Sequence, residues 1–554
     1  MYIKELKIEN FRGIREFKNT FDNKVICLIG ASDSTKTTLL DAIEFALYPS
    51  WNINVTNTDF YQCNLDNMIK IQVTIGNIPE YFLNEDTFGF YIRKYVINDT
   101  ENDEPSTEDE IFLTIQLTIN ELFEPEWKVI TNRGIEKTIN HRDRARFPIA
   151  RIGENIEKDF YIGRNSILKS YFNDTKELNS QLFALLQNIK KQDIDTTGLQ
   201  DKFDNIKKII DDYNIKLNSN LNLEIEMRSS DLNVSNVGIS DGIIPLNRKG
   251  TGTKRLLSSI LNLESKNNDS CILIDEFEYG IEPYRIADLL FKLKEKNRQS
   301  IITTHSPIPL TELDCDCIKI CRSKEGLTQC ISISSDLQSL IRTFPFAFLS
   351  RKILITEGAT EWGILRAHNE EWSKFSFSFA YSGGFILDGH GGARTIKYAK
   401  EFKKLGYDVG IFIDSDDNDT NLQASNLNDI KVFKFEDGYN TEKKILEDIK
   451  CENYHKIIEV LKNIRDEDYV NNLLITEFGT FDIDEILNRE NKKVIDGLYK
   501  IMTKKDSKGK DIFKGTNYGI MLGKQIIELS STDFASSKII SLIDNIRKWC
   551  HDIK

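Results

Sequence analysis

Hydrophobic residues in the first part of the chain recur with spacings that predict strands followed by a helix. Residues 2–8 (YIKELKI) alternate between apolar and polar positions, which is typical of a strand with one buried face. Residues 24–29 (KVICLI) form a nearly continuous apolar run, which is typical of a strand buried on both faces. That run ends at Gly30, and apolar residues then recur at helical spacing from Leu39 to Ala46. The pattern predicts a buried strand, a loop and a helix in direct succession.

Strand and helix patterns continue to alternate through the middle of the chain. Segments 68–76, 88–97 and 110–130 read as strands of a meander beside the first strand–loop–helix unit. Apolar residues then recur with helical period over about 165–220, which predicts a helical insertion that serves as an arm or a dimerisation element. Strand–loop–helix patterns return over 222–310. The alternation predicts an α/β fold.

A second alternating system begins with the apolar segment RKILIT at 351–356. Composition does not change sharply before it, so the order of motifs sets the boundary. We expect one domain over 1–345 and a second over 346–554.

Composition excludes several classes of protein. The 554 residues are 40% hydrophobic and 29% charged, which is typical of a folded globular protein and excludes global disorder. A net charge of −13 excludes a wholly basic protein that coats nucleic acid, but it is compatible with clusters of carboxylates that bind metal. No apolar run approaches the roughly 18–20 residues of a membrane span, and no signal peptide is visible. We therefore expect a cytoplasmic protein without a membrane segment.

A candidate phosphate-binding loop lies between the buried strand and the first helix. The segment GASDSTKT follows the pattern G-x-x-x-x-G-K-[ST], except that Thr35 replaces the second glycine. Lys36 would neutralise the β- and γ-phosphates at the helix N-terminus, and the Thr37 hydroxyl would reach Mg²⁺. Because a Cβ resists the positive φ that glycine adopts, a chance lysine at a helix start stays open as the alternative. The candidate residues of the loop are Gly30, Ser34, Thr35, Lys36, Thr37 and Thr38.

Later segments occur in the order that a nucleotide site requires. The apolar strand 271–274 ends in Asp275, which would hold Mg²⁺ through water, and Glu276, which would polarise the attacking water. A further apolar strand ends at His305, where the imidazole would sense the γ-phosphate. The segment KGTGTKR comes before both strands and precedes a helix. Its candidate residues are Gly250 and Gly252.

Together these segments resemble the ABC-type ATPases of the SMC, RecF and OLD group, and the opening IKELKIENFRGIREF is similar to their first strand. The resemblance covers about 1–345 and implies ATP as the cofactor. It also implies that KGTGTKR reaches across a dimer to the partner's γ-phosphate. The chain departs from the group at Asp33 and Thr35, where glycine is usual, so binding of ATP is expected and its hydrolysis is left open.

A second candidate site in the C-terminal domain consists of carboxylates. Glu357 follows the strand 351–356, and Glu361 lies one helical turn later on the same face. The apolar strand DVGIFI leads to Asp414 and Asp416, which point the same way in an extended chain. Because parallel strands bring their carboxyl ends to one edge, these carboxylates would converge and repel unless a divalent cation joins them. Mg²⁺ or Mn²⁺ would then activate water for phosphodiester cleavage. Solvated surface acids are the alternative.

This arrangement resembles a Toprim domain, the metal-dependent, Rossmann-like α/β fold of primases, topoisomerases and OLD nucleases. An ABC-type ATPase followed by Toprim in one chain is the organisation of the OLD family. The resemblance implies a further acidic metal ligand, which we place at Glu442, and a late lysine that balances charge at the scissile phosphate. Lys524 is our candidate for that lysine, and Lys514 is the alternative.

The leading hypothesis is an ATP-binding, metal-dependent DNA endonuclease of the OLD type. The resemblance implies a homodimer or tetramer formed through the ATPase domain and a role in bacterial defence against phage. It also implies a partner component, either a reverse transcriptase with its retron DNA or a helicase. The alternative is a nucleotide-switched DNA-binding or scaffold protein of the SMC/RecF type. A basic cluster is either a DNA contact or a solvated face, and it comprises Arg142, Arg144, Arg146 and Arg151.

Overall fold

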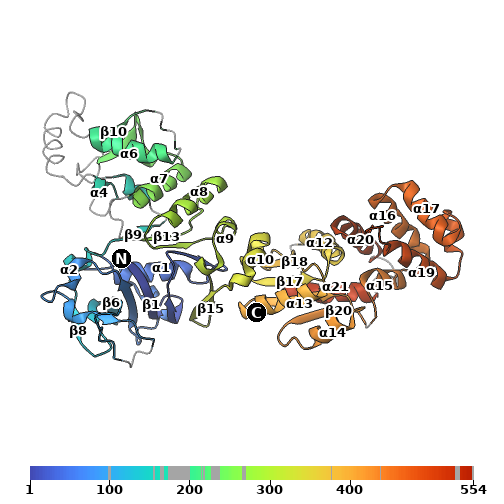
Figure 1. Cartoon of the computed structure of the whole chain (residues 1–554), viewed down its shortest axis with the longest axis horizontal. Coiled ribbons are helices and arrows are strands. Elements are labelled where there is room, and N and C mark those ends of the chain that lie inside the picture. Colours follow the sequence, from blue (N-terminus) through green and yellow to red (C-terminus); the bar gives the residue numbers. More distant parts are fainter. Residues whose placement is uncertain are drawn as a thin grey trace. The chain divides into compact units, whose positions relative to one another are not determined.

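The structure is a computed structural model that divides into two compact units, Met1–Pro345 (unit 1) and Phe346–Lys554 (unit 2) (Figure 1). No helix among the described residues is long and apolar enough to cross a membrane. The described residues are 1–97, 102–153, 156–161, 167–171, 200–213, 215, 217, 219–225, 237–264, 270–375, 377–436, 438–530 and 537–551.

Unit 1 is built on a mixed sheet to which the described residues contribute thirteen strands. In its antiparallel half, β1 pairs with β2 on one side and with β4 on the other, and the meander continues through β6, β7 and β8. The predicted strand over 88–97 is mostly wrong, because Gly89–Tyr91 forms a 3₁₀ turn and only β5 pairs with β6. The strands are β1 (Tyr2–Phe11), β2 (Ile14–Thr20), β4 (Ile69–Gly76), β5 (Arg93–Lys94), β6 (Ile111–Ile119), β7 (Pro125–Ile130) and β8 (Glu136–Thr138).

The other half of this sheet is parallel, in the order β9-β13-β14-β3-β15. Every residue of β3, β13 and β14 is buried, as their continuous apolar runs predict for strands covered on both faces. β15 turns back into β16, which lies beside β2 and joins the two halves. These strands are β3 (Val25–Ile29), β9 (Ile149–Ile152), β13 (Cys271–Ile274), β14 (Ser300–Thr303), β15 (Ile318–Lys324) and β16 (Leu327–Ser332).

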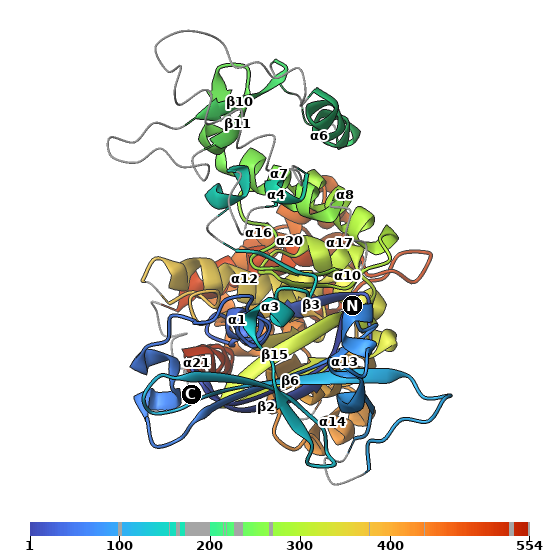
Figure 2. The same cartoon turned by 90° about the vertical axis from the view of Figure 1, so that its left-hand side faces the viewer.

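The predicted helical insertion over 165–220 falls largely outside the described residues. Within it, α4 (Leu168–Tyr171) and α6 (Gln200–Asp212) are helices. Figure 2 shows β10 (Leu221–Ile225) and β11 (Val237–Asp241) side by side, and β12 (Ile244–Pro245) completes this small sheet. The other helices of unit 1 are α1 (Lys36–Ala46), α2 (Glu80–Leu83), α3 (His141–Arg144), α7 (Thr251–Glu264), α8 (Pro283–Glu295), α9 (Ile308–Glu312) and α10 (Gln338–Thr343).

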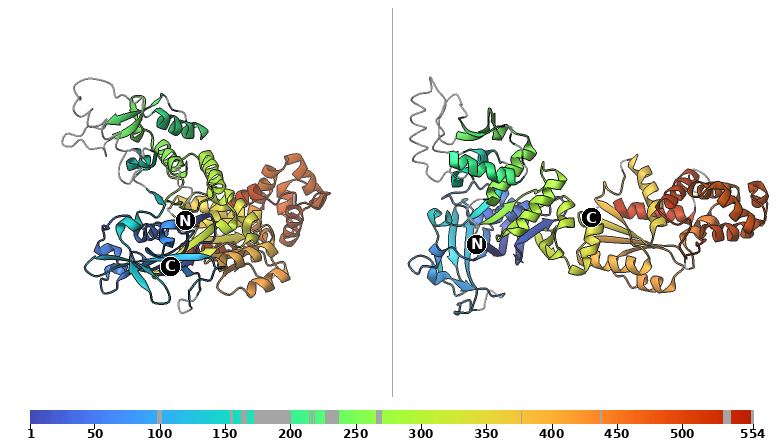
Figure 3. Two further views of the ribbon diagram at one scale, coloured as in Figure 1. Left: turned by 60° about the vertical axis from the view of Figure 1, so that its left-hand side comes forward. Right: turned by 45° about the horizontal axis from the view of Figure 1, so that its top comes forward.

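Unit 2 contains a parallel sheet in the order β18-β17-β19-β20, with α12 on one face and α13 and α14 on the other (Figure 3). The strands are β17 (Lys352–Thr356), β18 (Gly384–Asp388), β19 (Asp408–Ile413) and β20 (Lys431–Lys434). α11 (Pro345–Phe348) precedes them. The later helices are α12 (Ala359–Ser373), α13 (Gly392–Lys404), α14 (Asn418–Ser425), α15 (Thr441–Asp448), α16 (Tyr454–Ile464), α17 (Glu467–Phe478), α18 (Ile483–Leu487), α19 (Asn491–Met502), α20 (Thr516–Leu529) and α21 (Lys538–His551).

Helices α12 and α20 pack unusually closely because glycines face each other across their contact. A Cβ added to Gly363 would lie 2.4 Å from the carbonyl oxygen of Thr516, and one added to Gly519 would lie 2.2 Å from that of Thr360. Any side chain at these positions would push the helices apart. This contact sets the start of α20 against the start of α12, which directly follows β17.

Buried His368 on α12 gives unit 2 a defined dependence on pH. Burial lowers the pKa of its imidazole from 6.5 to about 4, and no described residue forms a hydrogen bond with Nε2. Because the folded state favours the neutral ring, its contribution is complete above pH 6.5 and is lost as the pH falls toward 4. We expect wild type to lose about 2 kcal/mol more unfolding free energy than His368→Leu between pH 7 and pH 5. Urea unfolding at both pH values measures this difference, and parallel losses in the two proteins would contradict it.

Candidate functional sites

Lys36 is the buried cation of the predicted phosphate loop. Its Nζ donates to the carbonyl oxygens of Gly30 (3.1 Å) and Ala31 (2.9 Å) and to Ser34 Oγ (3.2 Å). Burial lowers the pKa of the ammonium, and nearby acidic groups, among them Asp275, act in the opposite direction. Lys36 is also the first residue of α1, so its charge lies at a helix N-terminus, as a phosphate site requires.

The backbone of this loop adopts the conformation that glycine normally provides. Asp33 (φ 62°) and Thr35 (φ 64°) are both left-handed, although each carries a Cβ. Gly30 cannot be replaced, because a Cβ there would lie 2.5 Å from the carbonyl oxygen of Cys321. The loop therefore keeps the left-handed backbone at Asp33 and Thr35, and each residue costs roughly 1–2 kcal/mol of conformational strain.

Thr35→Gly is expected to relieve this strain. We expect about 1 kcal/mol of added unfolding free energy, after the entropy cost of glycine, and equal or tighter nucleotide binding. Thr35→Ala is the matched control, because it removes the same hydroxyl but keeps the Cβ. Thermal unfolding and titration with a fluorescent ATP analogue measure both effects. A glycine variant no better than the alanine variant would contradict the strain argument.

Asp275 joins the strand end to the loop. Its Oδ1 accepts hydrogen bonds from Thr37 Oγ1 (3.1 Å) and Thr303 Oγ1 (2.6 Å), and its Oδ2 accepts one from Arg151 Nη2 (3.0 Å). The structure thus brings together the acid and the hydroxyl that the sequence proposes as the magnesium ligands. Thr38 lies half-buried on the first turn of α1.

Glu276 and His305 follow neighbouring strands, β13 and β14. The N–H of Glu276 donates to Thr303 Oγ1 (2.8 Å), and the N–H of His305 donates to Glu278 Oε1 (2.6 Å). Burial, and then the positive charge of Lys36, lower the pKa of His305. His305 and the loop lysine therefore share one electrostatic environment.

The segment KGTGTKR leads into α7, which begins at Thr251. A Cβ on Gly252 would lie 2.0 Å from the carbonyl oxygen of Gly280, whereas one on Gly250 would meet no atom of the described residues within 4 Å. Buried Arg255 donates to the carbonyl oxygens of Gly153 (2.8 Å) and Glu276 (3.1 Å). Gly252 and Arg255 fasten α7 to the turn after β13, and Gly250 is left open.

In unit 2, a cavity of about 270 Å³ lies at the carboxyl ends of β17, β18 and β19. Glu357, Glu361 and Asp414 line it, as the sequence predicts. Glu357 Oε2 accepts the Asp414 N–H (2.9 Å). Asp416 is exposed beside this cavity, with Asn440 Nδ2 at 3.5 Å from its Oδ2.

Burial and the repulsion of neighbouring acids raise the pKa values of two of these carboxyl groups, Glu357 and Asp414. Burial, and secondarily Glu361 and Asp416, raise the pKa of Glu357 to about 7. Burial, and then Glu361, Glu442 and Glu357, raise the pKa of Asp414 well above its usual range. Asp414 keeps two donors on Oδ1, the N–H and the hydroxyl of Thr441, both at 2.9 Å. A cation at this cavity would relieve the repulsion.

The lysine of this cluster is Lys514, and the structure does not place Lys524 in it. Lys514 Nζ lies 3.4 Å from Glu442 Oε2, and these opposite charges outweigh burial and raise the pKa of Lys514. Glu442 is fully buried, and burial raises its pKa to about 7. Within the part of the chain that the structure describes, neither of its carboxylate oxygens accepts a hydrogen bond of good geometry. Lys524 is exposed within α20, about two turns beyond the helix start that faces the cavity.

The titratable residues of this cavity that sequence reasoning missed include Asp388, His390 and Asp511. His390 follows β18 with a left-handed backbone (φ 56°), and its Nδ1 lies 3.3 Å from Asp388 Oδ2. Positive φ at a non-glycine residue beside a glycine-rich loop is visible only in the structure. Gly358, Gly391 and Gly515 also line the cavity, and each precedes a helix, so the N-terminal ends of α12, α13 and α20 face it.

Among the described residues, no group of three His, Cys, Asp or Glu side chains is already arranged to hold a metal ion. The raised pKa values show that the carboxylates around the cavity influence one another. Their present positions among the described residues do not form a metal site.

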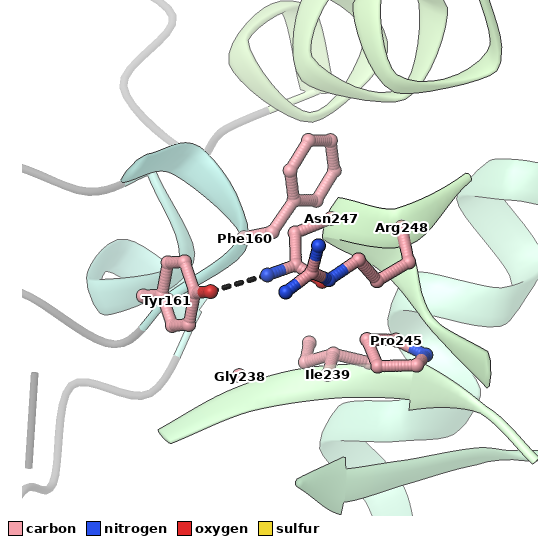
Figure 4. Close-up of a pocket in the computed structure, with 7 residues that line it drawn as sticks. All are labelled: Phe160, Tyr161, Gly238, Ile239, Pro245, Asn247 and Arg248. Atoms are coloured by element: carbon pink, nitrogen blue, oxygen red, sulfur yellow. Dashed lines mark hydrogen bonds between the residues drawn. The ribbon is translucent and has the colours of Figure 1, made fainter. Parts of the chain in front are cut away.

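A smaller pocket of about 110 Å³ lies beside the 3₁₀ turn Leu246–Arg248 in unit 1 (Figure 4). Asn247 donates a hydrogen bond to the Tyr161 hydroxyl at its rim, and Phe160 and Ile239 form its apolar wall. Among the described residues that line it, Arg248 is the one charged group.

The predicted basic cluster does not form one surface. Arg144 is buried, and it donates to the carbonyl oxygens of Tyr48 (2.8 Å) and Ile139 (2.6 Å). Arg151 pairs with Asp41 and Asp275. For these two residues both sequence interpretations, a DNA contact and a solvated face, are wrong.

Unit 1 thus has the parts of a P-loop nucleotide-binding ATPase: a buried central strand, a phosphate loop with Lys36 at a helix start, and an acid at the end of a parallel strand. The chain belongs to the AAA ATPase domain family, whose model matches residues 1–308.

Solved structures similar to this chain include two SMC head domains and a RecF protein. An SMC head bound to the C-winged helix domain of ScpA shares 15% identity over 60% of this chain and 98% of that chain, with a TM-score of 0.38. The SMC head domain from Thermotoga maritima shares 13% identity over 60% of this chain and 100% of that chain, with a TM-score of 0.31. The recombination mediator RecF with ATP shares 14% identity over 60% of this chain and 98% of that chain, with a TM-score of 0.36. No curated protein matches the chain.

Proposed function

We propose that the chain is an ATP-regulated, divalent-metal-dependent DNA endonuclease of the OLD type, in which unit 2 acts as a Toprim nuclease. The observation that carries this proposal is the cavity of unit 2, where buried acids, Lys514 and helix N-termini meet at the carboxyl edge of a parallel sheet. Acids alone would repel a phosphodiester. Lysine and helix N-termini attract one, so the mixture suits a phosphate that is cut beside a metal.

The residues present fit Mg²⁺ or Mn²⁺. Glu357 and Asp414 would hold the ion, with Glu361 and Asp416 as further ligands, since carboxylate oxygens are what these cations prefer. When bound, the ion supplies Lewis acidity and an activated water. Lys514 holds a non-bridging phosphate oxygen and balances Glu442. Three helix N-termini orient the phosphate.

In unit 1, ATP is proposed to bind at Lys36, Thr37 and Asp275, at the interface of a homodimer that KGTGTKR completes. Open space around Gly250 supports this arrangement, since a partner's phosphate has room to approach. A defence role against phage, and a partner such as a reverse transcriptase with retron DNA or a helicase, rest on the resemblance to the OLD family alone.

The direct test is supercoiled plasmid with purified protein and Mg²⁺ or Mn²⁺, with and without ATP. We expect nicked or linear product that disappears with EDTA, and a change in rate with ATP. Plasmid that stays supercoiled under every condition would contradict nuclease activity of the isolated chain.

A nucleotide-switched scaffold is the second candidate, because the described carboxylates are not yet arranged as a metal site. In a scaffold, DNA binding would respond to ATP but not to divalent metal at unit 2. Filter binding with wild type and Glu357→Gln, in ATP and in EDTA, separates the two functions.

A further inference from the structure

Arg151 occupies an unexpected position in the nucleotide site. It lies on β9, opposite Leu273 of the neighbouring β13, and its side chain is 11% exposed. Its Nη2 donates to both Asp41 Oδ1 and Asp275 Oδ2, each at 3.0 Å. Its Nη1 is buried and has no hydrogen-bond partner among the described residues. The guanidinium is therefore fixed on the acid that the site uses for its metal, with one N–H group unused.

A chain of ion pairs holds this guanidinium in place. Asp41, the first partner of Arg151, also pairs with Arg12, which in turn donates to Asp59 Oδ1 at 2.8 Å. Glu44 Oε2 lies 3.7 Å from Arg151 Nε. Because carboxylates surround Arg151 on several sides, moving it away from Asp275 would leave buried charges uncompensated.

Both carboxylate oxygens of Asp275 already accept hydrogen bonds from protein groups without a metal. Two hydroxyls donate to Oδ1, and Arg151 donates to Oδ2. A site of this kind needs positive charge for the phosphates and for its own acid. Here a side chain supplies part of the charge that a divalent cation would otherwise supply alone.

We propose that Arg151 is a positioning residue that serves as a built-in counter-charge of the nucleotide site. It holds Asp275 toward Thr37 and supports binding of the nucleoside triphosphate before a divalent ion arrives. It also limits how strongly the divalent ion adds to that binding, since two cations near one carboxylate repel. The proposal rests on nucleotide binding by unit 1 and is independent of nuclease activity.

The test compares the dissociation constant of a fluorescent, non-hydrolysable ATP analogue in EDTA with that in excess Mg²⁺. The dissociation constant in EDTA divided by that in Mg²⁺ measures how much the metal strengthens binding of the nucleotide. In Arg151→Gln we expect this ratio to rise about tenfold over wild type, because removal of one positive charge weakens metal-free binding and strengthens metal binding. A merely structural role would weaken binding under both conditions and leave the ratio unchanged.

Arg151→Lys keeps the positive charge, so its ratio should stay near that of wild type. The lysine variant also provides a test if the glutamine variant does not fold. A tenfold rise of the ratio in Arg151→Lys would overturn the role of charge. Arg12→Gln is the matched control, since it touches Asp41 but not Asp275. A wild type that binds no analogue would overturn the nucleotide site itself. An unchanged ratio in Arg151→Gln would overturn only the role of Arg151.

Discussion

Asp414→Asn is expected to reduce DNA cleavage by more than about 100-fold, because even groups that only support a metal ligand are worth 10–100-fold. The amide has the shape of the carboxylate, so its oxygen still accepts the two hydrogen bonds from Thr441. The negative charge that attracts the metal is gone. DNA binding is expected to survive, since the helix N-termini and Lys514 are unchanged. Plasmid cleavage and filter binding measure the two properties.

The same substitution is also expected to change the thermal stability of unit 2. Because burial, and then neighbouring acids, raise the pKa of Asp414 well above its usual range, removing its charge should stabilise unit 2 in the absence of metal. Asp419→Asn, in the exposed first turn of α14, is the matched control and should change neither property. Cleavage that persists in Asp414→Asn would move the chemistry away from this cavity.

Lys36→Ala is expected to weaken ATP binding by at least about 100-fold, since a buried ammonium on a phosphate contributes charge-assisted hydrogen bonds of about 1.5–3 kcal/mol each. The lysine already holds the loop through Gly30, Ala31 and Ser34, so its loss also loosens the loop that binds the phosphates. Calorimetric titration with ATP measures the affinity.

The control for Lys36→Ala is Lys24→Ala, an exposed lysine just before the opposite end of β3, bound to Asn297 Oδ1 (2.7 Å). It removes the same charge at the other end of the β3–loop–α1 unit and should leave the affinity unchanged. Equal affinities of wild type and Lys36→Ala for ATP would exclude this loop as the nucleotide site.

The sequence predicted which strands carry chemistry, because their signal is local. Apolar runs mark β3, β13, β17 and β19, and the residues that follow them are Gly30, Asp275, Glu357 and Asp414. Parallel strands then bring such ends to one edge without further information. The α/β class is confirmed for the same reason.

Residues brought in by tertiary packing could not be predicted in this way. Lys514 reaches the acids because glycines let α20 pack against α12, and the local sequence around Lys524 looks no different. Arg151 reads as part of a basic run, yet β9 pairs with β13 and places it against Asp275. Thr35 was expected to disturb the loop, but it adopts the glycine conformation instead.

The position of β3 has a consequence for synthesis of the chain. Its strand partners are β14 and β15, which begin only at Ser300 and Ile318. While the ribosome is still making the middle of the protein, the strand that leads into the phosphate loop has emerged but has both edges unpaired. Such long-range parallel pairing is slow, and exposed strand edges invite aggregation. The parallel half of unit 1 can therefore close around β3 only after Ser300 and Ile318 have been translated.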